Sequence, residues 1–114
     1  MPSLPPDTKP YHRTPEFTES SIPPSLVARP HATKPGVWER IRVYEGKIRC
    51  RRGERVQEVG PAREAIVEPG VPHRLELVGE PVRVSIEFLR GRGVRGHWSA
   101  REGDPREHNP RGAE

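Results

Sequence analysis

The chain has 114 residues, of which 31% are hydrophobic and 32% are charged. This length allows one domain with a modest core, and the fifteen prolines and eleven glycines indicate that part of the chain lies outside that core. The net charge of +4 is small and dispersed, whereas nucleic-acid binders usually concentrate basic residues on one face. Nucleic acid is therefore not an expected partner.

The sequence indicates a cytoplasmic protein that does not cross a membrane. No stretch approaches the ~20 consecutive apolar residues that span a bilayer. Residues 1–10 lack the basic and apolar regions of a secretory signal. Cys50 is the single cysteine, so no internal disulfide can form, which suits a reducing compartment.

Both ends of the chain are expected to lie outside the folded part. Residues 1–30 contain eight of the prolines and predict an extended arm rather than a helix or a strand, because proline fixes φ and removes a hydrogen-bond donor. The arm would pack on the folded part through its apolar side chains, which are Tyr11, Phe17, Ile22, Leu26 and Val27. Residues 91–114 are charged and rich in glycine and proline, which predicts a disordered, flexible tail with Trp98 as its one candidate for docking.

Residues 31–90 are expected to form one small, all-antiparallel β-barrel. Short segments of alternating apolar and polar residues are separated by glycine and proline, and no helical period of useful length is present. Short strands joined by frequent turns imply a sandwich or a barrel. The first alternation places Val37, Glu39, Ile41 and Val43 on one side and Trp38, Arg40, Arg42 and Tyr44 on the other.

A turn at Glu45-Gly46 predicts a first hairpin between residues 37–44 and 47–52. With a two-residue loop, the apolar inner face would carry the pairs Val43–Ile48 and Ile41–Cys50. The same register opposes like charges on the outer face, in the pairs Arg42–Arg49 and Arg40–Arg51. We expect that face to be solvated, or neutralised by acidic neighbours or by a bound anion.

A second hairpin is predicted between residues 73–78 and 82–88, with a type II′ turn at Gly79-Glu80. Its inner face would carry the pairs Leu77–Val82, Leu75–Val84 and His73–Ile86, and its outer face the pair Glu76–Arg83. A shorter strand is expected over residues 64–68.

His73 is the first candidate for chemistry, because it begins a strand on the apolar side directly after a Pro-Gly-Val-Pro turn. An imidazole at the mouth of a barrel can bind a metal ion or act as an acid or a base. The alternative is a partly buried histidine that is hydrogen-bonded to a backbone carbonyl.

Glu39 and His31 are the other two candidate metal ligands. Glu39 lies on the inner side of its strand, where an unpaired carboxylate would be costly. Its alternative role is a salt bridge with Arg52, which the hairpin register places opposite it. The direction of the His31 side chain does not follow from the sequence, and its alternative role is that of an exposed loop histidine.

Two short motifs resemble those of cupins. The segment Glu68-Pro69-Gly70-Val71-Pro72-His73 resembles the second cupin motif, in which a proline and glycine turn precedes a metal-binding histidine. Glu39 precedes Glu45-Gly46 with the acid-to-glycine spacing of the first motif. The paired His-x-His of that motif is absent, and Thr33 and Lys34 stand near those places.

Longer blocks resemble one cupin subfamily, the small domain shared by the tellurite-resistance protein TehB and the stand-alone YeaR-like proteins. These blocks are KPYHRTPEFTESSIP, HATKPGVWERIRVYEGKIR, VEPGVPHRLE and IEFL, in that order within residues 9–90. The resemblance implies a compact cupin-like β-barrel, a double-stranded β-helix, with family histidines at His31 and His73. TehB also carries a methyltransferase domain, but no glycine-rich segment for a methyl donor is present here, so methyl transfer is not expected.

The first functional hypothesis is a module that binds a divalent metal ion or a small ligand such as an oxyanion. His31, Glu39 and His73 would be the ligands, and two imidazoles with a carboxylate suit Zn²⁺, Fe²⁺, Mn²⁺ or Ni²⁺. The resemblance supplies the context of a response to toxic oxyanions or to nitrogen-oxide stress.

Two other functions stay open. One is a small metal-dependent oxygenase or isomerase, for which Tyr44, Cys50 and Glu87 are the available acid–base candidates. The other is a metal-free interaction module that contacts a partner through the arginine-rich outer face. A homodimer is expected by analogy with other cupin-like barrels.

Overall fold

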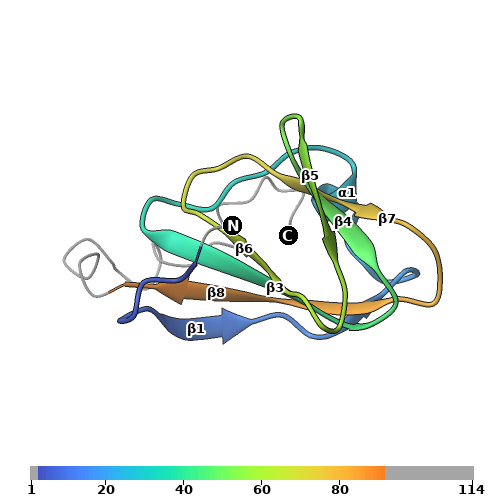
Figure 1. Ribbon diagram of the computed structural model, residues 1–114, viewed down its shortest axis with the longest axis horizontal. Coiled ribbons are helices and arrows are strands. Elements are labelled where there is room, and N and C mark those ends of the chain that lie inside the picture. Colours follow the sequence, from blue (N-terminus) through green and yellow to red (C-terminus); the bar gives the residue numbers. More distant parts are fainter. Residues whose placement is uncertain (1–2, 92–114) are drawn as a thin grey trace.

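The computed structural model describes residues 3–91, whose strands form two antiparallel sheets around one core (Figure 1). The larger, five-stranded sheet has the order β1-β8-β3-β6, with β2 also paired to β8, and the smaller, three-stranded sheet has the order β5-β4-β7. The larger sheet consists of β1 (Lys9–Arg13), β2 (Phe17–Thr18), β3 (Val37–Glu45), β6 (Ala65–Val67) and β8 (Arg83–Arg90). The smaller sheet consists of β4 (Ile48–Arg52), β5 (Arg55–Val59) and β7 (Arg74–Leu77). The described part has one helix, the single turn α1 (Pro24–Val27).

The expected all-β, antiparallel class is confirmed. Hydrogen bonds between strands stay within each of the two sheets, so residues 3–91 form no closed barrel. The core between the sheets takes side chains from both, including Val37 and Ile41 from β3, Ile48 from β4 and Leu75 from β7. The expected short strand at residues 64–68 is present as β6.

The inner faces of the strands are largely those that the alternation predicts. Along β3, Val37, Glu39, Ile41 and Val43 are buried, and the residues between them are partly or fully exposed. Along β4, Ile48 and Cys50 are buried in the same way. The period of two therefore identified which side chains point into the core.

The predicted first hairpin is wrong in its pairing. β3 lies between β8 and β6 in the larger sheet, and β4 lies between β5 and β7 in the smaller one. Ile41 is paired with Ile86 and Ala65, and Cys50 is paired with Gln57 and Leu75. Because both edges of each strand are already hydrogen-bonded, β3 and β4 cannot pair with each other, and the chain passes between the sheets at Gly46-Lys47.

The predicted second hairpin is wrong for the same reason. β7 pairs with β4, and β8 pairs with β1, β2 and β3, so the segment between them also passes from one sheet to the other. Leu75 and His73 are buried as expected, but Leu77 is 39% exposed at the end of its strand. The expected pair Glu76–Arg83 is replaced by ion pairs from Glu76 to Arg51 and Arg74.

Residues 3–30 are more ordered than an extended arm. Although this segment is rich in proline, β1 and β2 pair with β8, and α1 packs beside β7. The prolines are accommodated because β1 lies at the edge of its sheet and Pro24 begins the helix, where a missing N–H costs little. The apolar side chains of the segment do pack on the core: Ile22 and Leu26 are buried in it, and Tyr11, Phe17 and Val27 lie against it.

The expected oppositions Arg42–Arg49 and Arg40–Arg51 do not occur, because β3 and β4 lie in different sheets, although Arg51 is instead opposite Arg74. The expected neutralisation by acidic neighbours does occur. On the larger sheet, Arg40 is paired with Glu87. Its Nε and its Nη2 each lie 2.7 Å from Oε1 of Glu87. On the smaller sheet, Nε of Arg51 lies 2.6 Å from Oε2 of Glu76, and Arg49 is the strand partner of Glu58 and Glu76. These acidic neighbours of the arginines follow directly from the changed strand partners.

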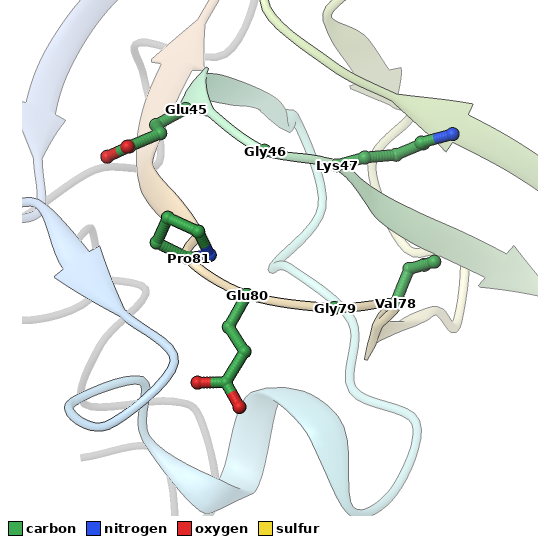
Figure 2. A pocket seen from close by; sticks show the side chains of 7 residues that line it. All are labelled: Glu45, Gly46, Lys47, Val78, Gly79, Glu80 and Pro81. Carbon is green, nitrogen blue, oxygen red and sulfur yellow. The ribbon is translucent and has the colours of Figure 1, made fainter.

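The two segments that pass between the sheets lie against each other (Figure 2). Residues 45–47 and 78–81 line a surface pocket of about 390 Å³, and the Glu80–Pro81 peptide bond is cis. Gly46 has a φ of +80°, and a Cβ at this position would lie 2.3 Å from the carbonyl oxygen of Pro81. Only glycine fits this passage without a shift of the neighbouring backbone.

In residues 3–91, no helix has the length and the apolar character needed to cross a membrane. The expected C-terminal tail, including His97, Trp98 and His108, lies outside the described residues apart from residue 91.

Candidate metal centre

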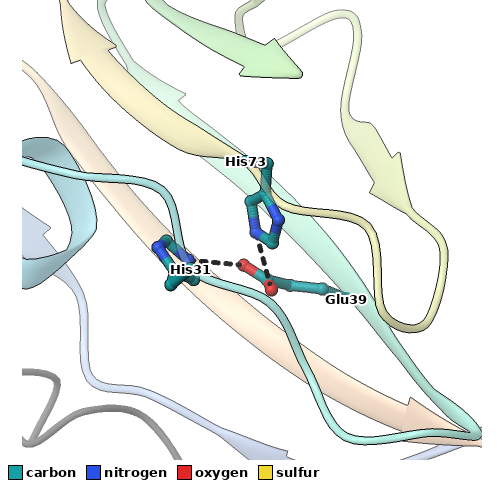
Figure 3. Close-up of side chains that lie close together, drawn as sticks. All are labelled: His31, Glu39 and His73. Carbon is teal, nitrogen blue, oxygen red and sulfur yellow. Dashed lines mark hydrogen bonds and ion pairs between the residues drawn. The ribbon is translucent and has the colours of Figure 1, made fainter. Parts of the chain in front are cut away.

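Three side chains predicted as metal ligands converge in the core (Figure 3). One ligand atom each of His31, Glu39 and His73 can be chosen so that all three lie within 4.8 Å of one another. All three residues are buried, with exposed fractions of 8% for His31 and 1% each for Glu39 and His73. The group joins three segments that lie far apart in the sequence.

A backbone bridge holds the two histidines side by side. The N–H of His31 donates to the carbonyl of His73, and the N–H of His73 donates to the carbonyl of His31, both at 2.8 Å. Residues that exchange two hydrogen bonds in this way project their side chains to the same face. The two imidazole rings accordingly lie with their centroids 4.3 Å apart.

Glu39 approaches the two histidines from the larger sheet. It lies in the middle of β3, where its strand partners are Val67 and Phe88. Because the neighbouring inward residues Val37 and Ile41 are apolar and fully buried, the carboxylate has no access to water and depends on polar partners in the core. The two histidines are those partners.

The ring of His73 is fixed by two hydrogen bonds. Its Nδ1 lies 2.8 Å from the carbonyl oxygen of Val71, which can only accept, so Nδ1 carries a proton and donates. Its Nε2 lies 2.9 Å from Oε1 of Glu39. A backbone carbonyl that holds Nδ1–H leaves Nε2 as the nitrogen directed at the other two ligands, which is a common arrangement for metal-binding histidines.

A proton is shared between His73 and Glu39, and the balance of charges favours its position on the histidine. Burial lowers the pKa of His73, but the Glu39 carboxylate and the two hydrogen bonds outweigh burial and raise it above its usual value. Burial raises the pKa of Glu39, but the positive His73, its hydrogen bond and the charges of His31 and Arg52 outweigh burial and lower it. Both shifts in pKa therefore favour the charged forms of the pair, an imidazolium and a carboxylate.

His31 is the least satisfied member of the group. Both of its ring nitrogens are buried and have no hydrogen-bond partner, although Nε2 lies 4.0 Å from Oε2 of Glu39. Burial lowers the pKa of His31 below its usual value, and the opposing effects of Glu39 and of the nearby Arg29 backbone do not offset it. A neutral imidazole with an unused lone pair beside a carboxylate is a ready metal ligand.

The expected salt bridge between Glu39 and Arg52 is not the main interaction of either residue. Glu39 contacts the two histidines, whereas Nη2 of Arg52 donates to the Ile66 carbonyl at 2.8 Å and to Oε1 of Gln57 at 3.2 Å. Arg52 acts on Glu39 only as a nearby positive charge.

The alternative expectation for His73, a hydrogen bond to a backbone carbonyl, is met by Val71, which sequence reasoning did not identify as that carbonyl. The Val71-Pro72-His73 turn was a signal that could have suggested it.

The acid–base candidates proposed for an enzyme lie in different places. The Tyr44 hydroxyl is hydrogen-bonded to Ser85 at 2.8 Å, and Glu87 is paired with Arg40, both away from the inner face of β3. Cys50 is buried on the inner face of β4, and burial raises the pKa of its thiol to about 11. A thiol with this pKa stays protonated at neutral pH and is a poor nucleophile.

The chain belongs to the TehB-like domain family, whose model matches residues 12–86. The crystal structure of TehB from Haemophilus influenzae is similar with a TM-score of 0.69 and 22% identity, over 75% of this chain and 32% of that one. This chain therefore corresponds to about a third of that protein.

A crystal structure of a protein from E. coli strain K12 has a TM-score of 0.72 and 20% identity, over 80% of this chain and 98% of that one. At these identities the likeness concerns the fold alone. No curated protein matches the sequence.

Proposed function

We propose that this chain is a cupin-like module that binds a divalent metal ion through His31, Glu39 and His73. The observation that carries the proposal is the convergence of three buried ligand side chains within 4.8 Å, one of which, His31, has two buried nitrogens without a hydrogen-bond partner. A buried polar atom without a partner costs about 1–3 kcal/mol, so such an atom needs an explanation. A bound metal ion would supply it for one of the two nitrogens.

The cupin assignment concerns how the two sheets relate to each other. Their inner faces enclose one core, and the candidate ligands come from β3 and from the bridge beside β7. These are the places where the two cupin-like motifs lie in the sequence. We interpret the two sheets as the two halves of a small cupin-like barrel.

Two imidazoles and one carboxylate form a ligand set that suits Zn²⁺, Fe²⁺, Mn²⁺ or Ni²⁺, with further positions left for water or a ligand. Such an ion acts as a Lewis acid when it is bound. The chain would contribute the orientation of His73 through the Val71 carbonyl and a buried carboxylate, Glu39, to balance the charge. Uptake of the ion would displace the proton shared by His73 and Glu39, so metal binding should release protons.

The biological role that we propose is a non-methyltransferase part of a stress response of the tellurite-resistance type. The support is membership of the TehB-like family. Because this chain corresponds to about a third of the H. influenzae TehB, the activities of that whole protein do not transfer to it.

The experiment is a metal analysis of the untagged protein by mass spectrometry after dialysis against each candidate ion. We expect about one ion per chain in the wild type and a loss of most of it in His31→Ala and in His73→Ala. His12→Ala is the matched control, because His12 lies on β1 and stacks on Phe88. It is outside the triad of His31, Glu39 and His73. Its metal content should equal that of the wild type.

Two results would overturn the proposal. One is a wild type that retains none of the four ions, and the other is an equal metal content in wild type and His73→Ala. Either would favour a metal-free module in which the hydrogen bond between His73 and Glu39 is purely structural. Circular dichroism of each variant separates loss of metal from loss of fold.

A further inference from the structure

Arg52 is a charged residue on the inner side of the smaller sheet. Ile48 and Cys50 on β4 point into the core, and the period of two places Arg52 on the same side. β4 is paired with β7 through Cys50–Leu75 and Arg51–Arg74, and continuing this register by one residue sets Arg52 beside His73. The arginine therefore belongs to the same face as the candidate metal ligand.

The hydrogen bonds of Arg52 use only part of its guanidinium. Nη2 donates to the Ile66 carbonyl of β6 at 2.8 Å and to Oε1 of Gln57 at 3.2 Å, so the side chain extends from the smaller sheet to the larger one. Its Nε, by contrast, is buried and has no hydrogen-bond partner. A guanidinium presents its donors in a planar fork, which suits two oxygens of one ligand.

Arg52 adds a positive charge to the face that carries the candidate metal ligands, because the register of β4 and β7 sets it beside His73. Arg52 and Gln57 are partly exposed, whereas Glu39 and His73 are buried. Arg52 thus lies between the partly exposed Gln57 and the buried triad.

The charges of such a site require an anion. A divalent ion with the Glu39 carboxylate and two neutral imidazoles has a net charge of +1, and the guanidinium of Arg52 on the same face brings it to +2. Uncompensated charge in a site shielded from water is costly, so a bound anion would stabilise it. Because the triad is almost fully buried, the anion must be small.

We propose that Arg52 is the anion-recognising residue of this site, and that its ligand is a small anion with oxygen donors, either a carboxylate or an inorganic oxyanion. One oxygen would bind the metal ion, and another would accept a hydrogen bond from Nε of Arg52. This inference rests on the proposed metal-binding function. It assigns to Arg52 a role beyond its link between the two sheets.

The test uses the Co²⁺-loaded protein, titrated separately with oxalate and with inorganic phosphate and followed by visible absorption and calorimetry. We expect at least one of the two anions to bind to the wild type, with an affinity that falls about tenfold or more in Arg52→Gln. Binding of oxalate alone would identify the ligand class as carboxylate, and binding of phosphate alone would identify it as inorganic oxyanion. The Co²⁺ content of Arg52→Gln should stay at the wild-type level, because Arg52 is not a metal ligand.

Arg49→Gln is the matched control, because Arg49 lies on the same strand but is exposed on the opposite face. Its anion affinity should equal that of the wild type. If Arg52→Gln fails to fold, Arg52→Lys keeps the positive charge but removes Nε, and it should weaken anion binding several-fold. Equal affinity in the wild type and the folded Arg52 variant, or no binding of either anion to the Co²⁺-loaded wild type, would overturn the inference.

A failure of the metal site itself can be recognised separately. If the wild type takes up no Co²⁺, the proposed function fails, and the same titrations on the metal-free protein then decide the role of Arg52. Anion binding that is lost in Arg52→Gln would still support that role, and the absence of such binding would overturn it.

Discussion

Nε2 of His73 lies 2.9 Å from Oε1 of Glu39, and Nδ1 of the same ring lies 2.8 Å from the carbonyl oxygen of Val71. The imidazole is thus held at both nitrogens, with the carboxylate on one side and a neutral acceptor on the other. His31 lies beside the same carboxylate without a hydrogen bond to either ring nitrogen. Two buried histidines around one glutamate therefore have opposite titration behaviour.

The first prediction concerns this difference in the metal-free protein. The pKa of His73 should lie above the usual value of 6.5 and that of His31 below it, because only His73 has a hydrogen bond to Glu39. In Glu39→Gln the pKa of His73 should fall, since burial would then act without a compensating carboxylate. Imidazole resonances in an NMR titration with a chelator present measure both values. A higher pKa for His31 than for His73 would contradict this assignment.

The second prediction is the pH dependence of stability that follows from the pair. The raised pKa of His73 stabilises the fold below its unfolded value of about 6.5, and this contribution is lost as pH rises through the folded pKa. The lowered pKa of Glu39 stabilises the fold above its unfolded value of 4.5, and this is lost as pH falls through the folded pKa.

Glu39→Gln should consequently lower the free energy of unfolding most near about pH 6 and less near about pH 9. Urea denaturation of the metal-free wild type and variant at both pH values checks this. A difference between the two proteins that grows with pH would be inconsistent with an imidazolium–carboxylate pair.

The third prediction concerns Gly46, where the chain passes from β3 to β4. Gly46→Ala should lower the free energy of unfolding by about 2 kcal/mol or more, because it combines an unfavourable positive φ with a contact against the Pro81 carbonyl. Gly70→Ala is the matched control, with a φ of +76° and no atom within 4 Å of the added Cβ. Its free energy of unfolding should fall only by the cost of the positive φ, about 1 kcal/mol. Equal losses in the two variants would show that the Pro81 contact relaxes at no cost.

The fourth prediction compares two ion pairs on outer faces. Glu87→Gln should cost about 2 kcal/mol, because the side chains of Glu87 and Arg40 are only 9% and 21% exposed, and Arg40 would keep only the more distant Glu64, at 3.9 Å, as a charged partner. Glu76→Gln should cost less, since the side chains of Glu76 and Arg51 are 20% and 36% exposed and more strongly screened. Chemical denaturation at low and high salt measures both, and a larger loss for Glu76→Gln would contradict the burial argument.

The fifth prediction is that Cys50 is unreactive in the folded protein. Burial raises the pKa of its thiol to about 11, so both access and the thiolate fraction are small at about pH 8. A chromogenic disulfide reagent should label Cys50 slowly in buffer and rapidly in guanidinium chloride. Rapid labelling of the native protein would mean that the inner face of β4 opens readily.

The sequence predicted which side chains point inward more reliably than which strands are neighbours. Alternation along residues 37–43 is a local property, so the inward positions of Glu39 and Ile41 follow from it. The pairing of β3 with β8 depends on residues 38 to 53 positions away, and a short turn such as Glu45-Gly46 serves equally well in a hairpin or in a passage between sheets. Local chemistry cannot distinguish these two outcomes.

The candidate site was predictable in part for a similar reason. Glu39 lies on β3 and His73 lies directly before β7, both in segments with clear alternation, and their inward direction could be derived. His31 lies outside any alternating segment, and its position depends on a single bridge to His73. Only the family resemblance suggested it, because the two backbone hydrogen bonds of that bridge leave no mark on the local pattern.

The position of β8 has a consequence for how the chain acquires its fold. This strand is the last of the described elements, yet it lies between β1 and β3, so the earliest and a central strand of the larger sheet meet only through it. During synthesis, β1 and one edge of β3 must therefore stay unpaired until residues 83–90 have left the ribosome. Pairing between such distant segments slows folding and leaves strand edges available for association with other chains. The larger sheet is thus expected to be completed only once β8 is available.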